Sequence, residues 1–194
     1  NFSEEEFMNM TDSVLHFLQR MGFKPEVRDR ENHRLQAFRR NIYFPQLLYD
    51  LRLTAHREER FLVKIECQDQ LVEYRSQLAN IRGCGFFFPF PVPPDPVLCS
   101  MKLAALLTRS KGRDFYDAMF LLGQTAPDYG FLASRCGITD PAMLKNALMD
   151  LAIKVDLANK ARDFEHLVFE PRHCKRILGF GDFVNGLPGF AQVL

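Results

Sequence analysis

The segment from Met101 to Met119 holds the densest run of side chains that can do chemistry. Its basic residues include Lys102, Arg109 and Arg113, and the second and third of these lie seven and eleven positions after the first. On one unbroken helix the three side chains would lie within about 40° of one another, with Asp117 beside them. Such a cluster suits a triphosphate or a nucleic-acid backbone, because guanidinium and ammonium groups form charge-assisted hydrogen bonds with phosphate oxygens.

Two features of the same segment allow another interpretation. Gly112 can end the helix and break the alignment of the cations. Arg113 and Asp117 are four positions apart, which is the spacing of an intrahelical ion pair on a solvated helix face. The spacing alone leaves both the phosphate site and the solvated face open.

A second group of candidate residues lies on the clearest strand of the sequence, Phe61–Cys67. Residues alternate between two faces of this strand. One face carries Phe61, Val63, Ile65 and Cys67, and the other carries Leu62, Lys64 and Glu66. We expect Lys64 and Glu66 to face a common cleft, and the preceding Ala55–Arg60 to be a solvated turn.

The first half of the chain must position that strand. Ser3 and Glu6 predict a capping box at the start of a helix, with Phe2 and Phe7 in the positions of a hydrophobic staple. The helix is expected to end at Gly22 and to bury one stripe, formed by Phe7, Met10, Val14, Leu18 and Met21. Two short strands are predicted after it, Leu35–Phe38 and Asn41–Phe44, the second of them ended by Pro45.

The second half reads as helical. Gly85–Pro94 must be extended because of its prolines, and we interpret it as a semi-rigid connector. Asp95 and Pro96 then give the signal for a helix start. The predicted helices are Pro96–Ser110, Arg113–Gly123, Tyr129–Arg135, Pro141–Asn159 and Arg172–Gly181. The sequence therefore predicts an α+β fold, with an α/β part over residues 1–94 and a helical domain over residues 95–194.

Composition narrows the class of protein. Among 194 residues 47% are hydrophobic and 25% charged, as in globular proteins, and the net charge of +1 provides no global attraction to nucleic acid. The five cysteines form no Cys-x-x-Cys pair, and Cys67 and Cys99 have the apolar neighbours of buried reduced thiols, so we expect a cytoplasmic protein. No uncharged stretch is longer than Gly83–Pro94, which is too short to span a bilayer, so we expect no membrane segment. Phe86–Phe90 can stack on bases or fill the core of its own domain.

Lys102–Asp117, written K-x6-R-x-K-G-R-D-x-Y-D, resembles the signature segment of the AbiEii/AbiGii family. These are nucleotidyltransferase-like toxins of abortive-infection (phage-defence) and toxin–antitoxin systems. The resemblance extends upstream to Leu-Tyr-Asp-Leu-Arg-Leu at 48–53 and to the Lys-x-Glu strand, and it covers most of residues 1–125. It implies part of a polymerase-β-like sheet followed by a helical domain.

The resemblance also implies an activity and assigns residues to it. Such a toxin would transfer a nucleotide from an NTP, with Mg²⁺, to a nucleic acid such as tRNA or to a protein hydroxyl, and an antitoxin would neutralise it. Glu66 matches the family's third carboxylate, a ligand of Mg²⁺. The resemblance makes Glu66, Lys102 and Asp117 catalytic, gives Lys64, Lys102, Arg109 and Arg113 to the nucleotide, and makes Asp114 structural or orienting.

The sequence departs from the family's pattern in its first motifs. It contains no Gly-Ser or Gly-Thr dipeptide and no Asp-x-Asp. One carboxylate cannot replace three, so we expect the natural protein to continue upstream of Asn1 and to carry these motifs there. A catalytically inactive module that binds a nucleotide or a partner protein stays open as the alternative function, and a purely structural helical domain as a third.

Overall fold

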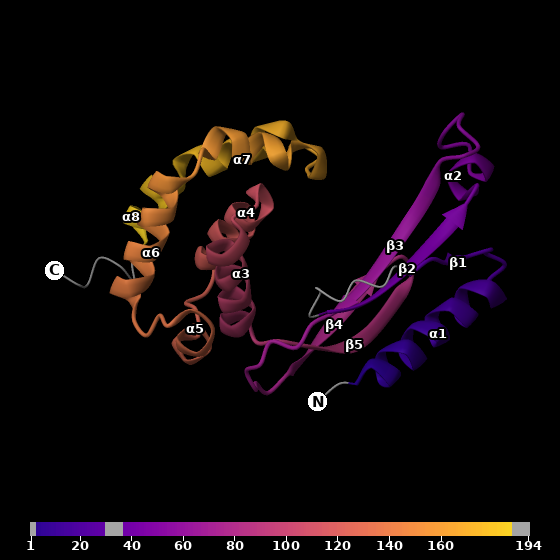
Figure 1. Cartoon of the computed structure of the whole chain (residues 1–194), viewed down its shortest axis with the longest axis horizontal. Coiled ribbons are helices and arrows are strands. Elements are labelled where there is room, and N and C mark those ends of the chain that lie inside the picture. The colour runs from indigo at the N-terminus through magenta and orange to yellow at the C-terminus, as the bar shows by residue number, and fades with distance from the viewer. Residues whose placement is uncertain (1–2, 30–36, 188–194) are drawn as a thin grey trace. The chain divides into compact units, whose positions relative to one another are not determined.

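A computed structural model of the chain describes residues 3–29 and 37–187 (Figure 1). Its contacts divide the chain into two compact units, Asn1–Leu71 and Val72–Leu194. The described residues form small antiparallel sheets and eight α-helices, and the C-terminal half is helical. The predicted α+β class is confirmed at this level, whereas the domain boundary at residue 94 stays a prediction.

The first unit is a three-stranded antiparallel sheet with one long helix. Its elements are α1 (Glu4–Arg20), β1 (Glu26–Val27), β2 (Phe38–Pro45), α2 (Leu47–Asp50) and β3 (Arg60–Cys67). The strand order is β1-β2-β3, so β2 is central. The register pairs Arg39 with Glu66 and Asn41 with Lys64. Directly paired residues share a face, so Lys64 and Glu66 lie on the same face of the sheet, as the alternation predicts.

The capping box of α1 is confirmed. The Ser3 hydroxyl accepts from the backbone N–H of Glu6 at 3.2 Å, and the Glu6 carboxylate accepts from the backbone N–H of Ser3 at 2.7 Å. These contacts lower the pKa of Glu6, because they stabilise its charged form. The staple partner Phe2 lies outside the described residues.

The predicted buried stripe of α1 is wrong beyond its first turns. Phe7 and Thr11 are buried, and the Phe7 ring lies 5.8 Å from that of Phe38 on β2. Met10, Val14 and Met21 are exposed. Small three-stranded sheets offer a helix a narrow surface, so only part of the apolar side of α1 is covered. The two short strands predicted over 35–44 also need correction: Phe38–Pro45 is one strand, and Leu35 lies outside the described residues.

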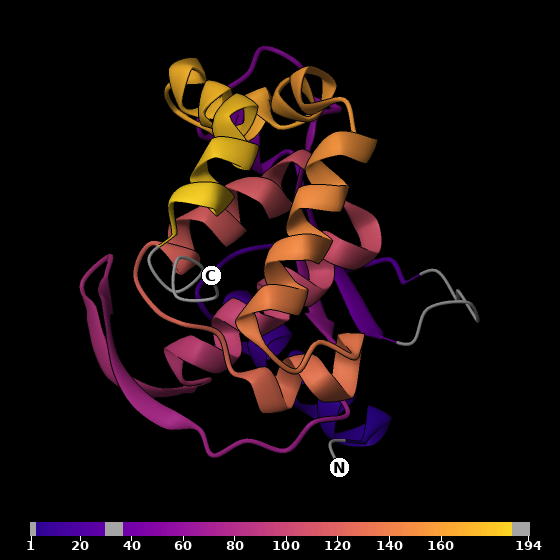
Figure 2. The same cartoon turned by 90° about the vertical axis from the view of Figure 1, so that its left-hand side faces the viewer.

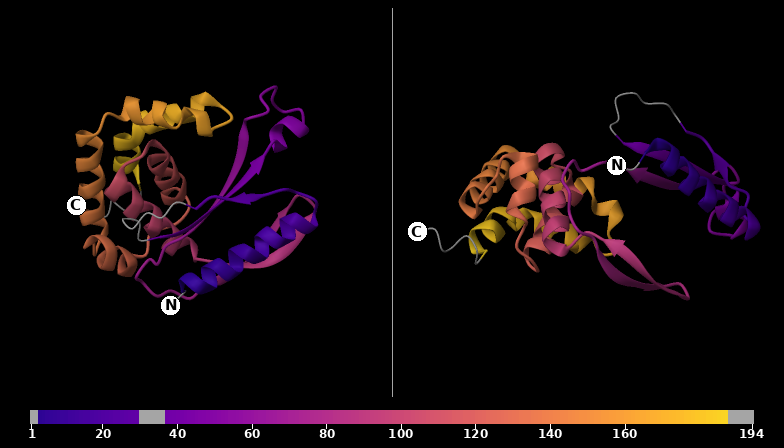
Figure 3. Two further views of the ribbon diagram at one scale, coloured as in Figure 1. Left: turned by 45° about the vertical axis from the view of Figure 1, so that its right-hand side comes forward. Right: turned by 90° about the horizontal axis from the view of Figure 1, so that it is seen from below.

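The second unit starts with a hairpin that the sequence does not predict. β4 (Gln77–Gly83) pairs with β5 (Phe86–Val92) through a tight turn in which Cys84 and Gly85 both have positive φ. The segment interpreted as a connector is therefore extended, as its prolines require, but it is a paired strand. Figure 3 shows this hairpin reaching away from the helices of its unit. Phe86, Phe87, Phe88 and Phe90 are exposed there, so they do not fill a core.

The helices of the second unit pack around one core (Figure 2). They are α3 (Asp95–Arg109), α4 (Gly112–Leu122), α5 (Tyr129–Cys136), α6 (Pro141–Lys154), α7 (Leu157–Asp163) and α8 (Phe180–Gly186), with 3₁₀ turns at Glu165–Leu167 and Pro171–Gly179. Fully buried side chains such as Leu103, Phe115 and Ile177 form the core between these helices. The rings of Phe115 and Phe180 pack edge to face there, with their centroids 4.9 Å apart.

Two predicted helices of this unit are wrong in extent. Pro141–Asn159 is two helices, because Val155 is extended and the Asp156 side chain caps a new helix by accepting from the backbone N–H of Asn159. Arg172–Gly181 is mostly 3₁₀ helix that runs into α8. Asp140 caps α6, since its carboxylate accepts from the backbone N–H of Met143.

Candidate functional site

The signature segment is not one helix. Ser110 takes a left-handed conformation (φ 49°, ψ 43°), so α3 ends at Arg109 and a new helix, α4, starts at Gly112. The alignment of Lys102, Arg109 and Arg113 on one helical face is therefore wrong. Lys102 and Arg109 keep their relation on α3, and Arg113 belongs to α4.

The turn between the two helices is held by an ion pair in which the carboxylate is buried and the guanidinium is 43% exposed. The Arg109 guanidinium donates from Nε to Asp114 Oδ2 at 2.9 Å and from Nη2 to Oδ1 at 2.7 Å. The backbone N–H of Lys111 donates to Oδ2 at 3.1 Å. The Asp114 side chain is only 1% exposed, and it lies in the first turn of α4, where a helix dipole favours negative charge. Asp114 thus holds the turn between α3 and α4, and the structural or orienting role that the resemblance gives it in the site stays a prediction.

A second ion pair joins the same helices. Lys102 Nζ on α3 lies 2.7 Å from Asp117 Oδ2 on α4. Both side chains stay partly open to solvent, at 38% and 33% exposure. Asp117 therefore pairs with a lysine of the preceding helix. The solvated-face interpretation predicted a pair between Asp117 and Arg113 within one helix, which is not the pair observed. The two pairs differ in their carboxylates, because Asp117 is partly open to solvent and Asp114 is buried.

The glycine of the signature lies where α4 meets α7. Gly112 is buried, and a Cβ on it would lie 2.0 Å from the backbone oxygen of Lys160. No other residue allows that approach without moving the backbone. The glycine of the signature segment is thus required for the packing of α4 against α7, in addition to any role of the charged residues beside it.

A cavity of about 330 Å³ opens beside this junction. Its walls come from the start of α4 and from the segment that follows α7, and they comprise Lys111, Gly112, Arg113, Asp163, Phe164, His166 and Leu167. Arg113, predicted to bind the nucleotide, therefore lines this cavity, together with Lys111.

The two candidate residues of the first unit, Lys64 and Glu66, lie on one face of the sheet. Arg39, on the neighbouring strand β2, lies directly opposite Glu66 on that face. Glu66 Oε1 lies 2.5 Å from Arg39 Nε, and Lys64 is exposed. Glu66 and Lys64 belong to a different unit from Lys102 and Asp117. Their roles stay predictions.

The residues described do not by themselves fit a Mg²⁺ ion. Mg²⁺ needs several oxygen ligands, and no group of three or more Asp, Glu, His or Cys side chains comes together anywhere in 3–29 or 37–187. Glu66 has Arg39 as its neighbour.

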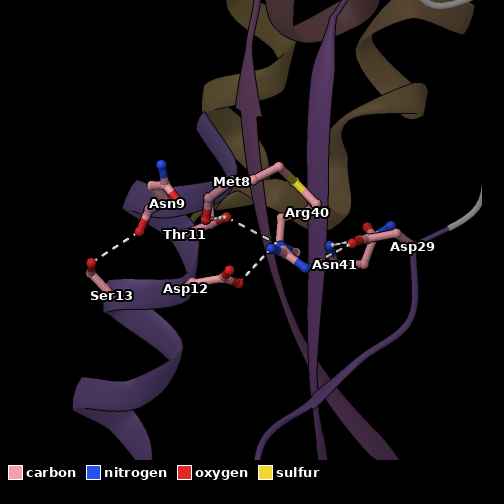
Figure 4. Close-up of polar contacts among 8 residues, drawn as sticks. All are labelled: Met8, Asn9, Thr11, Asp12, Ser13, Asp29, Arg40 and Asn41. Carbon is pink, nitrogen blue, oxygen red and sulfur yellow. Dashed lines mark hydrogen bonds and ion pairs between the residues drawn. The ribbon is translucent and has the colours of Figure 1, made fainter. Parts of the chain in front are cut away.

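Sequence reasoning missed a buried arginine in the first unit. Arg40 is 8% exposed, yet its guanidinium donates to Thr11 Oγ1 (3.1 Å), Asp12 Oδ1 (2.6 Å) and Asp29 Oδ2 (3.3 Å), as Figure 4 shows. Asp29 also accepts from the backbone N–H of Asn41 at 2.8 Å. The sequence does contain a sign of this site: Arg40 lies two positions before Ile42, so the strand period places this basic residue on the same buried face of β2. Its contacts satisfy it within the fold, so it is structural.

Comparison with known proteins gives no relative. No protein-family model, curated protein or solved structure matches the chain. None of the helices in the described part of the chain is long and apolar enough to span a membrane. The function has to come from the motifs and from the geometry of the two units.

Proposed function

We propose that the chain belongs to a nucleotidyltransferase-like toxin of the AbiEii type, which transfers a nucleotide from an NTP to an acceptor and is controlled by an antitoxin. The acceptor would be a nucleic acid such as tRNA, or a protein hydroxyl. The signature resemblance supports this proposal, together with the pairing of four signature residues across α3 and α4: Lys102 with Asp117, and Arg109 with Asp114.

The observation that carries the proposal is the difference between those two pairs. The Asp114 carboxylate is buried and fixes the turn, whereas the Lys102–Asp117 pair is partly open. A lysine held by one carboxylate at a surface keeps two further N–H donors for phosphate oxygens. Lys102 is therefore the residue we assign to the nucleotide phosphates, with Asp117 orienting it.

Lys64, Glu66 and the Mg²⁺ of the transfer reaction are part of the proposal only through the resemblance. Glu66 is ion-paired with Arg39, and one carboxylate does not make a magnesium site. Transfer would need further carboxylates, the Asp-x-Asp that the sequence of 194 residues does not contain.

A catalytically inactive module that binds a nucleotide or a partner protein is the second candidate. The absence of Asp-x-Asp from the sequence favours it, as does the pairing of Lys102 and Arg109 with carboxylates of their own helix pair. Both candidates share the phosphate contact of Lys102 and differ in transfer.

Titration of the chain with ATP, GTP, CTP and UTP by calorimetry, with and without Mg²⁺, tests the shared step. Lys102→Ala removes a charge-assisted contact of about 1.5–3 kcal/mol and should weaken binding at least about tenfold. The exposed Lys175→Ala is the matched control and should leave the affinity unchanged. Equal affinity of Lys102→Ala and the unaltered chain would reject both candidates.

Incorporation of labelled nucleotide into tRNA or protein by the complete natural protein separates the two candidates. Transfer that is lost in Glu66→Ala supports the enzyme. Binding without transfer to any acceptor supports the inactive module.

A further inference from the structure

The cavity beside the start of α4 carries two signature cations that no ion pair uses. Lys111 and Arg113 are both exposed, and within the described residues neither makes an ion pair with a carboxylate. The neighbouring signature residues are committed elsewhere: Arg109 holds Asp114, and Lys102 holds Asp117. Lys111 and Arg113 instead share the lining of one cavity.

The opposite wall adds a polar and an apolar surface. It is formed by Asp163, the last residue of α7, and by residues 164–167 after it, and Asp163 and His166 are the polar residues of this wall. Phe164 is 4% exposed, and its ring packs 5.5 Å from that of Tyr116, so its position is fixed by the core. Leu167 extends this apolar surface. One side of the cavity is thus cationic, and the other presents the exposed side chains of His166 and Leu167 over the buried Phe164.

The charge of the site comes from side chains and not from the helix end. The Asp114 carboxylate already lies in the first turn of α4 and accepts from the backbone N–H of Lys111. Asp163 is the one acid among the lining residues, against Lys111, Arg113 and a histidine. This balance favours an anion, and a volume of about 330 Å³ is larger than a bare phosphate needs.

We propose that this cavity binds a nucleotide 5′-phosphate, with the phosphate on Arg113 and Lys111 and the base against the exposed His166 and Leu167. Arg provides a planar fork for two phosphate oxygens, and an aromatic ring provides a stacking surface that accepts any base. The free mononucleotide and the 5′ end of an RNA carry this same group. The site is separate from the Lys102 site of the proposed function, since Lys102 is not among the lining residues described.

The test is calorimetric titration of the full chain with adenosine 5′-monophosphate, with inorganic phosphate and with a 5′-phosphorylated RNA tetramer. Arg113→Gln should weaken adenosine monophosphate binding about tenfold and Lys111→Gln about fivefold. Asp163→Asn should tighten it about threefold, because it removes the like charge. Arg135→Gln, an exposed arginine at the end of α5, is the matched control and should change nothing. Melting temperatures of all variants show that each is folded.

Each outcome decides a point. Unchanged affinity in both Arg113→Gln and Lys111→Gln overturns the site, and so does absence of binding at millimolar nucleotide. Inorganic phosphate that binds as tightly as the nucleotide overturns the role of His166 and Leu167. Tighter binding of the RNA than of the mononucleotide identifies the RNA end as the source. If Lys102→Ala leaves adenosine monophosphate binding intact while Arg113→Gln abolishes it, the inference stands whether or not the proposed function does.

Discussion

Gly112 and Lys160 meet so closely that a Cβ on the glycine would lie 2.0 Å from the lysine's backbone oxygen. The contact joins the first residue of α4 to the last turn of α7, two helices nearly fifty residues apart in the sequence. It therefore fixes where the signature cations Lys111 and Arg113 lie relative to the 163–167 segment. The glycine in K-G-R-D is needed for packing, whatever ligand the neighbouring charges bind.

Gly112→Ala should destabilise the second unit. The added methyl group meets backbone atoms, which cannot rotate away, so we expect a loss of about 2 kcal/mol or more in the free energy of unfolding. Chemical denaturation measures it. Gly181→Ala on α8 is the control: nothing lies within 4 Å of its Cβ position, and alanine in a helix should be stabilising by about 0.5–1 kcal/mol. A neutral Gly112→Ala would contradict the contact.

The two ion pairs between α3 and α4 should differ in their effect on stability. Asp114→Ala removes the acceptor of two Arg109 N–H groups and of the Lys111 backbone N–H, and because Arg109 is 43% exposed and can be solvated, it should cost about 1–2 kcal/mol. Asp117→Ala removes a pair that is about one-third exposed on each side, and should cost less than about 1 kcal/mol. Urea titration of both variants checks this order. The reverse order would show that the Lys102–Asp117 pair is the structural one.

Arg40→Gln should destabilise the first unit. It removes the charge that faces Asp12 and Asp29, and because both carboxylates are partly exposed we expect a cost of about 2 kcal/mol. Arg28→Gln is the matched control. Its pair with Glu26 is half exposed on both sides and should contribute about 0.5 kcal/mol or less. Thermal unfolding followed by circular dichroism compares the two, and equal losses would argue against the buried network of Figure 4.

Cys99 should make the chain less stable in alkali. Burial raises the pKa of its thiol from 9.0 to about 11, because the core does not solvate a thiolate. The folded state then binds more protons than the unfolded state between these values, so stability falls as the pH rises from about 9 to about 11, by up to about 2–3 kcal/mol. The difference between the unaltered chain and Cys99→Ala over this range isolates the thiol.

The same burial predicts selective chemistry at neutral pH. Cys84, exposed in the hairpin turn, should react with a disulfide reagent in the folded protein, whereas Cys99 should react only after unfolding. Counting modified cysteines by mass spectrometry before and after denaturation tests this. Modification of Cys99 in the folded state would contradict its burial.

Features that depend on residues a few positions apart could be predicted from the sequence. Ser3 and Glu6 cap α1, and the alternation over Phe61–Cys67 places Lys64 and Glu66 on one face. These patterns are read correctly because hydrogen bonds within one helical turn, and the two-residue period of a strand, hold wherever the element is placed.

The partners of the charges were decided only by the tertiary structure. The left-handed Ser110 turns the chain between α3 and α4, so helical phase cannot relate Lys102 to Arg113, and Asp117 meets Lys102 from the next helix. Likewise, β4 could not be predicted from the sequence, because its residues show no clear alternation of apolar and polar side chains. Its pairing with β5 defines it as a strand. The sequence by itself determined which residues carry charge and where some helices begin, as at Ser3 and Asp95. Which charges are buried, paired or left in a cavity depended on contacts between distant segments, and no local period encodes those.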